Sequence, residues 1–343
     1  MHKVITFGIP SYNAAKDMDH CITSILEGSN YATDIEIIVV DDGSKDETAA
    51  KADEWEARYP GIIRAVHQEN GGHGIAVLSG LREAQGTYYK VVDSDDWLDG
   101  AALSTMLSIL RGFEERDQRV DLFISNYVYE KVYEGTHTAI GYKFALPRKK
   151  IFSWDQIGHF RPDQNLLMHS LCYRTDVLRE SNLPMPAHTF YVDNIYAYVP
   201  LPRCKTIYYA DIDLYRYFIG REGQSVNEAT MVKRLGQQFR VTRIMMESFH
   251  LYQDVESSRL RSYMMGYFTM MMAICSVLTK LSEEDCADER LKTLWKDLKE
   301  YDERMYRRAR YGVVGFFTNL HGRAGDKTTL GLYHLASKIF KFN

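Results

Sequence analysis

Short apolar runs alternate with amphipathic stretches over the first hundred residues of the chain. Runs rich in β-branched residues predict strands, and apolar residues at helical spacing predict helices. Such an alternation is typical of βα units and predicts a mainly parallel sheet flanked by helices. The expected strands are Val4–Pro10, Ile35–Asp41, Ile62–His67, Tyr88–Asp93 and Val120–Tyr129. The expected helices are Met18–Glu27, Glu47–Tyr59, Ile75–Ala84 and Ala101–Arg116.

The pattern changes twice after this region. Residues 130–220 are aromatic and irregular, and six prolines interrupt any long element there, which suits a binding surface better than a regular layer. From Thr230 onward proline is absent, and the apolar spacing is helical through most of Met231–Tyr311. We therefore expect three parts: residues 1–105 and 106–228 as two halves of an α/β domain, and residues 229–343 as an all-helical module.

Composition and charge narrow the class of protein. The 343 residues include 42 Lys and Arg against 46 Asp and Glu, so the formal net charge is −4. We expect no nucleic-acid partner, because neutralising the phosphates of a duplex usually requires a clear basic excess. The five cysteines are scattered and never form a C-x-x-C pair, which fits reduced thiols inside a cell. The N-terminal residues lack the long apolar run of a signal peptide, so we expect a cytoplasmic protein.

Two stretches of the helical module are candidates for crossing or contacting a membrane. Ser262–Thr279 carries no charge over a length near that of a short membrane span. Its Ser, Thr, Gly and Tyr content favours instead a buried, methionine-rich core helix or a helix that faces a partner. Over Tyr301–Asn343 eight basic residues stand against three acidic ones, an excess that suits either anionic lipid or an ordinary solvated face.

Four polar motifs follow the expected strands, at the ends where an open α/β sheet places its ligand crevice. They are Pro10-Ser11-Tyr12-Asn13, Asp41-Asp42-Gly43-Ser44, Asn70-Gly71-Gly72-His73-Gly74 and Asp93-Ser94-Asp95-Asp96. Each alone is compatible with a helix cap or a tight turn. Together they direct two carboxylate clusters at one crevice, where the clusters would repel each other unless a cation or hydrogen-bond donors offset them.

Two common nucleotide sites are excluded by these motifs. A dinucleotide fold requires G-x-G-x-x-G directly after the first strand, and this chain has Pro10-Ser11-Tyr12-Asn13 there. A G-x-x-x-x-G-K-[ST] phosphate loop is also absent from the sequence. What remains is a nucleotide held by an aromatic face and carboxylates, with its phosphates reached through a metal ion.

The motifs resemble those of family 2 glycosyltransferases with the GT-A fold. The resemblance rests on the residues after the first strand, the Val39-Val40-Asp41-Asp42-Gly43-Ser44 motif, the Asn70-Gly71-Gly72 turn and the Val92-Asp93-Ser94-Asp95-Asp96-Trp97-Leu98 segment. It is strong over Lys3–Leu103, weaker to about Val226, and excludes the helical tail. It implies an α/β nucleotide-diphospho-sugar transferase fold, with nucleotide-sugar binding in residues 1–105 and acceptor binding and a lid in residues 106–228.

The resemblance also implies roles for single residues. Tyr12 would stack on the base, and Asp42 or Asp41 would accept the imide N–H of uracil, which favours a UDP-sugar donor. Asp95 or Asp96 would hold Mn²⁺ or Mg²⁺ at the diphosphate. The alternative is that Ser94 to Asp96 only cap the next helix. The full set of expected donor-binding residues is Pro10, Tyr12, Asn13, Asp41, Asp42, Asn70, His73, Asp93, Ser94, Asp95, Arg216 and Arg221.

A base and a lid are expected in the second half. By resemblance the base is Asp193, in Phe190-Tyr191-Val192-Asp193-Asn194, although Val192 stands where the family usually has Glu. Asp193 is alternatively a cap of the helix over Asn194–Val199. The segment Leu214–Val226 looks like a lid whose Arg216 or Arg221 would pair with the diphosphate, unless these arginines stack on neighbouring rings.

These features predict an inverting, metal-dependent transfer of one sugar from UDP to a hydroxyl of a glycan or lipid-linked glycan. By resemblance the product is a cell-surface polysaccharide made at the inner face of the plasma membrane. The basic, amphipathic tail Ala336–Phe342 would give peripheral membrane contact through the C-terminal helices. A nucleotidyltransferase and a catalytically silent nucleotide-sugar-binding scaffold subunit are the alternatives. Homo-oligomerisation stays open.

Overall fold

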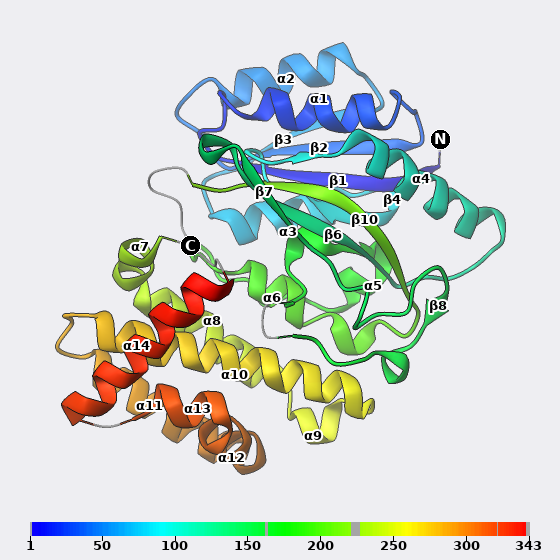
Figure 1. The fold of residues 1–343 in the computed structure, drawn as a ribbon. Helices are drawn as coiled ribbons and strands as arrows, with labels where there is room; N and C mark the ends of the chain where they lie inside the picture. The colour runs from blue at the N-terminus through cyan, green and yellow to red at the C-terminus, as the bar shows by residue number, and fades with distance from the viewer. Residues whose placement is uncertain (1, 162–163, 221–226, 321, 341–343) are drawn as a thin grey trace. The chain divides into compact units, whose positions relative to one another are not determined.

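The computed structural model describes residues 2–161, 164–220, 227–320 and 322–340, excluding the side chains of 336–340 (Figure 1). The chain divides into two compact units. Unit 1 comprises Met1–Gly158 and Leu166–Ile219, and unit 2 comprises His159–Asn165 and Gly220–Asn343.

Unit 1 is built on a mixed sheet with the strand order β3-β2-β1-β4-β9-β6-β10-β5, to which β7 and β8 add at the side. The strands β1 to β4 are all parallel and the pair β6 and β10 is also parallel, while β9 runs antiparallel between the two sets. The strands are β1 Lys3–Ser11, β2 Ile35–Asp41, β3 Ile63–His67, β4 Gly86–Val91, β5 Trp97–Leu98, β6 Leu122–Lys131, β7 Thr136–Ile140, β8 Ile151–Phe152, β9 Leu171–Arg174 and β10 Ile207–Phe218. The prediction of a mainly parallel central sheet is confirmed.

Helices cover both faces of this sheet, and every residue of β1 and β2 is buried as a result. Right-handed crossovers place α1 and α2 on one face, because β1, β2 and β3 follow one another in one direction. The return from β3 to β4 places α3 on the other face (Figure 1). The helices are α1 Met18–Gly28, α2 Thr48–Arg58, α3 His73–Glu83, α4 Gly100–Glu115, α5 Thr175–Glu180 and α6 Asp193–Tyr198, with short 3₁₀ turns that include η1 Val132–Glu134 and η3 Met168–Ser170.

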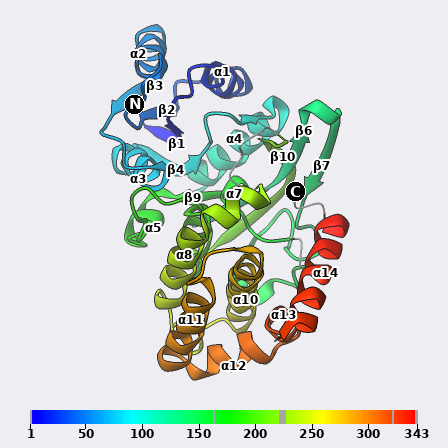
Figure 2. The ribbon, with the colours of Figure 1, turned by 90° about the vertical axis from the view of Figure 1, so that its left-hand side faces the viewer.

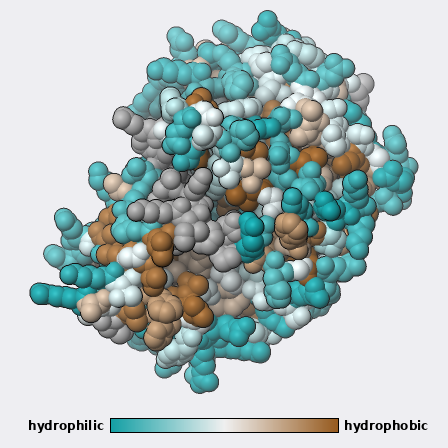
Figure 3. All heavy atoms as spheres, in the orientation of Figure 1, coloured by the Kyte–Doolittle hydropathy of each residue, from teal (hydrophilic) through white to brown (hydrophobic). Residues whose placement is uncertain are grey.

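From Asn227 onward the described residues of unit 2 are helical outside the connecting turns, as the sequence predicts. Its helices are α7 Glu228–Lys233, α8 Leu235–Glu247, α9 Leu251–Asp254, α10 Ser258–Leu281, α11 Ala287–Tyr301, α12 Glu303–Tyr311, α13 Val313–Thr318 and α14 Gly322–Phe340. Figure 2 shows α8, α10 and α11 side by side, in agreement with their mutual contacts. Apolar side chains gather on the surface over α13 and α14 (Figure 3).

The central helix of unit 2 is α10, which packs against each of the other seven helices of the unit. It is long and apolar enough to cross a membrane by length and composition, but 67% of its most apolar window is buried inside the protein. The buried side chains include Met264, Met265, Met271 and Met272. The prediction of a methionine-rich core helix is therefore confirmed.

Candidate active site

The polar motifs that follow the strands lie at one edge of the unit 1 sheet. β1 pairs with β2 so that Ser11 stands opposite Asp41, and it pairs with β4 so that Gly8 stands opposite Val91. Because these strands are parallel, the residues that follow them leave the sheet on the same side. β2 also pairs in parallel with β3, so that Asp41 stands opposite His67, and all four motifs therefore follow neighbouring strand ends.

The motif after β1 is fastened to the motif after β2. Pro10 is buried at the end of β1, whereas Tyr12 is 48% exposed and presents its ring at the surface. Asn13 has a φ of 51°, and its amide donates to Ser44 Oγ over 3.0 Å. The amide of Lys45 donates in return to Asn13 Oδ1 over 2.8 Å. These bonds fix the backbone directly after the exposed Tyr12 ring.

Asp42 organises the glycine turn. It is buried, and its Oδ1 accepts hydrogen bonds from Gln68 Nε2 (2.6 Å) and the Gly71 amide (2.8 Å), while Oδ2 accepts from the Gly72 amide (2.8 Å). Asn70 Nδ2 donates to the carbonyl of Asp42 over 2.9 Å. Gly72 has a φ of 85°, and a Cβ there would lie 2.9 Å from a backbone nitrogen, so only glycine fits. The turn and Asp42 thus form one rigid unit.

The carboxylate of Asp41 also has hydrogen-bond partners within the protein. Its Oδ1 accepts from the Ser44 amide over 3.0 Å, and its Oδ2 lies 3.3 Å from His67 Nδ1. Both aspartates that the sequence offers for the uracil imide are therefore already hydrogen-bonded within the protein. A carboxylate has about four acceptor positions, so these bonds leave acceptor capacity on either residue.

Three acidic side chains cluster on the turn between β4 and β5. Asp93 Oδ1 lies 2.8 Å from His73 Nε2, and Ser94 and Asp95 beside it are partly exposed. Asp96 is buried: its Oδ2 accepts from the Tyr215 hydroxyl (2.7 Å) and its Oδ1 from the Phe218 amide (2.8 Å). The helix after this turn is capped by Asp99 and not by this segment. The cluster is therefore not explained as a helix cap.

His169 completes the cluster and was not singled out from the sequence. It lies on η3, is 6% exposed, and its Nε2 is 3.7 Å from Asp93 Oδ2. Its ring stacks on Tyr217 at 4.4 Å between centroids and meets Tyr215 edge-on. Ligand atoms of Asp93, Asp96 and His169 all lie within 4.8 Å of one another. No local spacing in the sequence connects His169 with the acidic turn, because a separate segment brings it there.

The pKa values of the residues in this cluster shift in different directions. Burial opposes ionisation of Asp93, but the imidazoles of His73 and His169 outweigh it and hold its pKa well below the ordinary value. Burial, together with the charges of Asp95 and Asp93, raises the pKa of Asp96 well above the ordinary value. Burial likewise opposes the charged form of His73, yet the adjacent Asp93 raises the pKa of this imidazole.

Asp193 is the first residue of α6 and lies within the electrostatic reach of the same cluster. Burial raises the pKa of its carboxyl, and the charges of His169 and His73 partly offset that effect. Asn194 Nδ2 donates to Asp193 Oδ1 over 3.3 Å. The predicted base and the predicted metal-binding turn therefore belong to one charged site in unit 1.

Arg216, expected at the diphosphate, forms a bridge between two carboxylates. Its guanidinium donates to Asp99 Oδ2 over 2.9 Å and to Glu130 Oε1 over 2.8 Å. These ion pairs tie β10 to β6 and to the start of α4, with Arg216 only 23% exposed. Arg221, the other expected arginine, lies outside the described residues.

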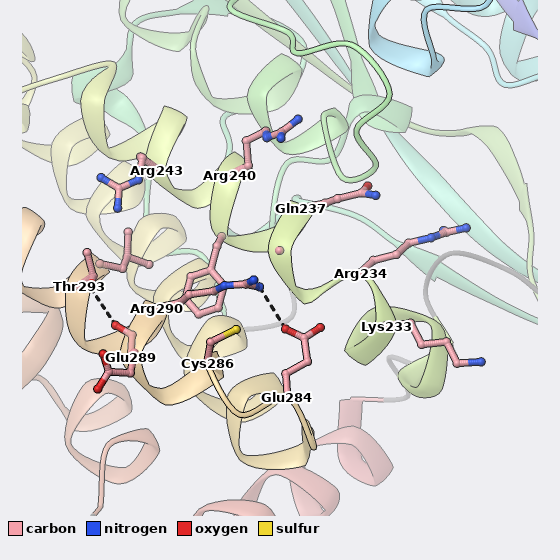
Figure 4. A pocket seen from close by; sticks show the side chains of 13 residues that line it. Lys233, Arg234, Gln237, Arg240, Arg243, Glu284, Cys286, Glu289, Arg290 and Thr293 are labelled. Carbon is pink, nitrogen blue, oxygen red and sulfur yellow. Dashed lines mark hydrogen bonds and ion pairs between the residues drawn. The ribbon is translucent and has the colours of Figure 1, made fainter.

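Unit 2 contains a separate hollow of about 790 Å³ between α8 and α11 (Figure 4). Its cationic lining includes Arg243 and Arg290, and both pair with acids: Arg290 lies 3.1 Å from Glu284, and Arg243 lies 2.6 Å from Asp297. None of the residues predicted for the donor, metal or base lines it. The carboxylate chemistry belongs to unit 1.

Comparison with known proteins identifies the domain that builds this edge. Residues 6–167 match the model of the family described as glycosyl transferase family 2. This chain carries a family 2 glycosyltransferase domain. The predictions of that family and of a glycosyltransferase domain are confirmed.

The family 2 domain is similar to two curated proteins over part of their length. The uncharacterized glycosyltransferase EpsJ of Bacillus subtilis is 37% identical over 101 residues, which are 29% of this chain and 28% of EpsJ. Chondroitin synthase of Escherichia coli is 30% identical over 159 residues, which are 46% of this chain and 22% of that protein. The matched segments therefore span less than a third of either relative.

The fold as a whole is similar to that of a solved structure. S. aureus TarS 1-349 matches 96% of this chain and 91% of its own length with a TM-score of 0.68 at 15% identity. The same protein in complex with UDP-GlcNAc matches with a TM-score of 0.66, again at 15% identity, over 97% of this chain and 92% of its own length. This likeness shows the GT-A fold followed by a helical region and confirms the predicted fold class.

Proposed function

We propose that this protein is an inverting glycosyltransferase that moves one sugar from a UDP-sugar to a hydroxyl of a glycan or lipid-linked glycan. We assign it to the synthesis of cell-surface polysaccharide, in the cytoplasm at the inner face of the plasma membrane. The observation that carries the proposal is the shared site of Asp193 and the acidic turn Asp93–Asp96, joined through His73 and His169. The family 2 domain, the UDP-GlcNAc complex of TarS and the similarity to a chondroitin synthase support it.

The donor would lie across the strand ends. The exposed face of Tyr12 suits stacking on a pyrimidine ring, and Asp41 and Asp42 beside it supply acceptors for the imide of uracil. Pro10, Asn13, Asn70 and Ser94 would shape the path of the nucleotide and sugar. Because a cytosine ring lacks the imide N–H, this arrangement favours UDP.

The acidic turn fits a divalent cation. Asp93, Asp96 and His169 bring ligand atoms close together, and Asp95 adds a carboxylate on the same turn. Hard oxygen ligands suit Mg²⁺ or Mn²⁺. Burial, and then the negative charges of Asp95 and Asp93, raise the pKa of Asp96, and a cation would offset those charges. Such an ion, when bound, neutralises charge on the diphosphate leaving group. Asp96 holds β10 through both oxygens, which leaves Asp95 as the more accessible carboxylate.

Asp193 would act as the general base. A sugar hydroxyl is a weak nucleophile, so a carboxylate must take its proton while the new bond forms. The acceptor oxygen bonds to the anomeric carbon as the bond from that carbon to the phosphate oxygen breaks, the proton passes to Asp193, and UDP leaves. Attack opposite the leaving group inverts the anomeric centre. The raised pKa of Asp193 makes it a stronger base than an exposed aspartate.

Substitution of the base tests the proposal. Asp193→Asn should abolish transfer and leave UDP binding unchanged in calorimetry, because the amide cannot take the proton and the proposal places Asp193 at the acceptor hydroxyl. Asp117→Asn is the matched control, since Asp117 is exposed with a φ of 49° that asparagine accepts. A panel of UDP-, GDP- and dTDP-sugars with Mn²⁺ supplies the donor.

Three outcomes would contradict the proposal. Unchanged turnover in Asp193→Asn would refute the base. Release of pyrophosphate from a nucleoside triphosphate by the wild type would indicate a nucleotidyltransferase. UDP binding without transfer or donor hydrolysis across the panel would indicate a binding or scaffold subunit.

A further inference from the structure

The helix α13 presents a row of apolar side chains to solvent. Val313 is 76% exposed, Val314 49%, Phe316 54% and Phe317 42%, and Tyr311 just before them is 68% exposed. Figure 3 shows hydrophobic side chains gathered over α13 and α14. A group of neighbouring apolar side chains that is exposed on a folded protein usually marks a contact with another apolar phase.

This outward arrangement is built into the packing of unit 2. Gly315 is the buried residue of α13, and a Cβ there would lie 1.7 Å from the carbonyl oxygen of Ala309, so no side chain fits on the inner face. Thr329 Oγ1 donates to the carbonyl of Phe317 over 2.8 Å, and Asn319 Nδ2 donates to the carbonyl of Gly315 over 2.8 Å. The backbone is thus anchored to the unit while the bulky side chains stay outside.

The exposed side of α14 extends the same surface. Ala324, Thr328, Gly331, Leu332 and Leu335 recur at helical spacing and are all exposed. They include no charged side chain, and Leu332 and Leu335 are 42% and 55% exposed. We call α13, Tyr311 and this face of α14 the apolar platform.

Basic residues outnumber acidic ones on α12 and α14, the helices that flank α13 in the chain. Glu303 pairs with Arg307, and Asp326 pairs with Lys280. Asp302 caps α12 by accepting from the Met305 amide. The other charged side chains of α12 and α14 within the described residues are basic: Arg304, Arg308, Arg310, Arg323 and Lys327, of which Arg304 and Arg310 lie over the rings of Tyr252 and Trp295.

We propose that the apolar platform docks this protein on an anionic lipid bilayer. Aromatic and aliphatic side chains would enter the boundary between headgroups and acyl chains, and the arginines and lysines of α12 and α14 would contact the lipid phosphates. Anionic headgroups neutralise these cations, which an apolar protein groove would not do. The residues of the tail to which the sequence assigned membrane contact, Ala336–Phe342, have no described side chains, and the contact surface inferred here precedes them.

Vesicle flotation tests this inference with the full chain. The protein should float with vesicles of phosphatidylcholine and phosphatidylglycerol, and much less with phosphatidylcholine alone. Phe316→Ser should weaken binding by about tenfold, the effect of withholding one phenylalanine from an apolar phase. Phe144→Ser is the matched control, because Phe144 is 78% exposed in unit 1 and should not change binding.

Reversing the charge of two basic residues tests the electrostatic contribution to vesicle binding. Arg323→Glu with Lys327→Glu should weaken binding by about tenfold or more at low salt, and high salt should reduce that difference. Lys149→Glu with Lys150→Glu makes the same change of net charge on an exposed segment of unit 1 and should have little effect.

Two results would overturn the inference. One is failure of the wild type to bind anionic vesicles, or equal losses in Phe316→Ser and Phe144→Ser. The other is a dimer in solution that Phe316→Ser dissociates, which would make the apolar platform an interface between copies of the chain. The inference does not rest on the proposed function, because sugar transfer to a soluble acceptor is measured without vesicles and should be unchanged in Phe316→Ser.

Discussion

Lys90 provides a quantitative test of the structure beneath the candidate site. It lies in β4 with no exposed surface, and its Nζ donates to the carbonyls of His169 (2.7 Å) and Leu171 (3.4 Å). The ammonium also lies 5.2 Å from the centre of the Tyr215 ring. Burial nevertheless lowers the pKa of Lys90 from 10.5 to about 8. The folded protein therefore holds this proton less tightly than the unfolded chain does.

The sign and size of the effect on stability follow from that difference. Below about pH 8 Lys90 is charged in both states, and the cost of burying the charge is fully present. Between about pH 8 and 10.5 the unfolded chain binds the proton and the folded protein does not, so stability rises with pH. At about 1.4 kcal/mol per pH unit, the gain from pH 7 to 10 is about 2.5 kcal/mol.

Lys90→Met removes this dependence. We expect the free energy of unfolding of the wild type, minus that of Lys90→Met, to rise by about 2.5 kcal/mol between pH 7 and 10. Guanidinium unfolding in EDTA would be followed by fluorescence in a Trp295→Phe background, so that only the tryptophans of unit 1 report. Lys150→Met, at an exposed lysine, is the control and should give a flat difference.

A constant difference for Lys90→Met across this range would refute the reasoning. It would mean that the buried ammonium keeps an ordinary pKa, either because water reaches it or because its carbonyl partners fully replace its hydration. A difference that falls as pH rises would also refute it, since it would require the folded state to hold the proton more tightly.

Three further predictions concern the base, the helical unit and the bridging arginine. The transfer rate should fall with decreasing pH at a value above 3.8, because burial raises the pKa of Asp193, and an unchanged rate at pH 4 would contradict its role. Gly315→Ala should destabilise unit 2 by about 1–3 kcal/mol in urea unfolding, whereas Gly266→Ala, which meets no atom within 4 Å, should not. Arg216→Ala should lower the free energy of unfolding by about 1–3 kcal/mol, because it leaves two partly buried carboxylates without their ion-pair partner. Arg148→Ala, at a more exposed arginine, should lower it by less than about 1 kcal/mol. Equal losses in the two variants would argue against a bridging role of Arg216.

The sequence predicts the first half of the fold well because its strands are buried on both faces. The apolar runs expected at Val4–Pro10 and Ile35–Asp41 coincide with β1 and β2 to within one residue at each end. Each run is β-branched and bounded by turn residues, so local pattern and tertiary environment agree. The end of α3 is also close to prediction, although the helix starts two residues earlier, at His73.

Residues 130–220 were expected only as an irregular, aromatic region. Its strand β9 has four residues, which is too short for a periodic signal. β10 changes register twice between Tyr209 and Tyr215, so its side chains do not keep one alternation. These strands are specified by their neighbours in the sheet, and a single sequence does not record those neighbours.

The residues of the candidate site also differ in how well the sequence predicts them. The acidic residues could be read from the sequence because a parallel sheet brings strand ends together, whatever the rest of the chain does. Two of the groups that contact these carboxylates come from elsewhere, His169 from η3 and Tyr215 from β10, whereas His73, at the start of α3, was already among the residues expected at the donor. None of these has a fixed spacing from the acidic turn, because each is positioned by a different element of the fold.

This distribution also explains why Asp93 and Asp96, three residues apart, have opposite electrostatic character. Asp93 faces two imidazoles, so its charge is compensated and its pKa falls. Asp96 faces a hydroxyl and an amide, which donate hydrogen bonds but carry no charge, so burial and its acidic neighbours raise its pKa. A cation bound between Asp93 and Asp96 would offset the negative charge that the protein itself leaves uncompensated. In the function proposed above the base is Asp193, which the imidazoles only partly compensate, whereas Asp96 is held by Tyr215 and Phe218.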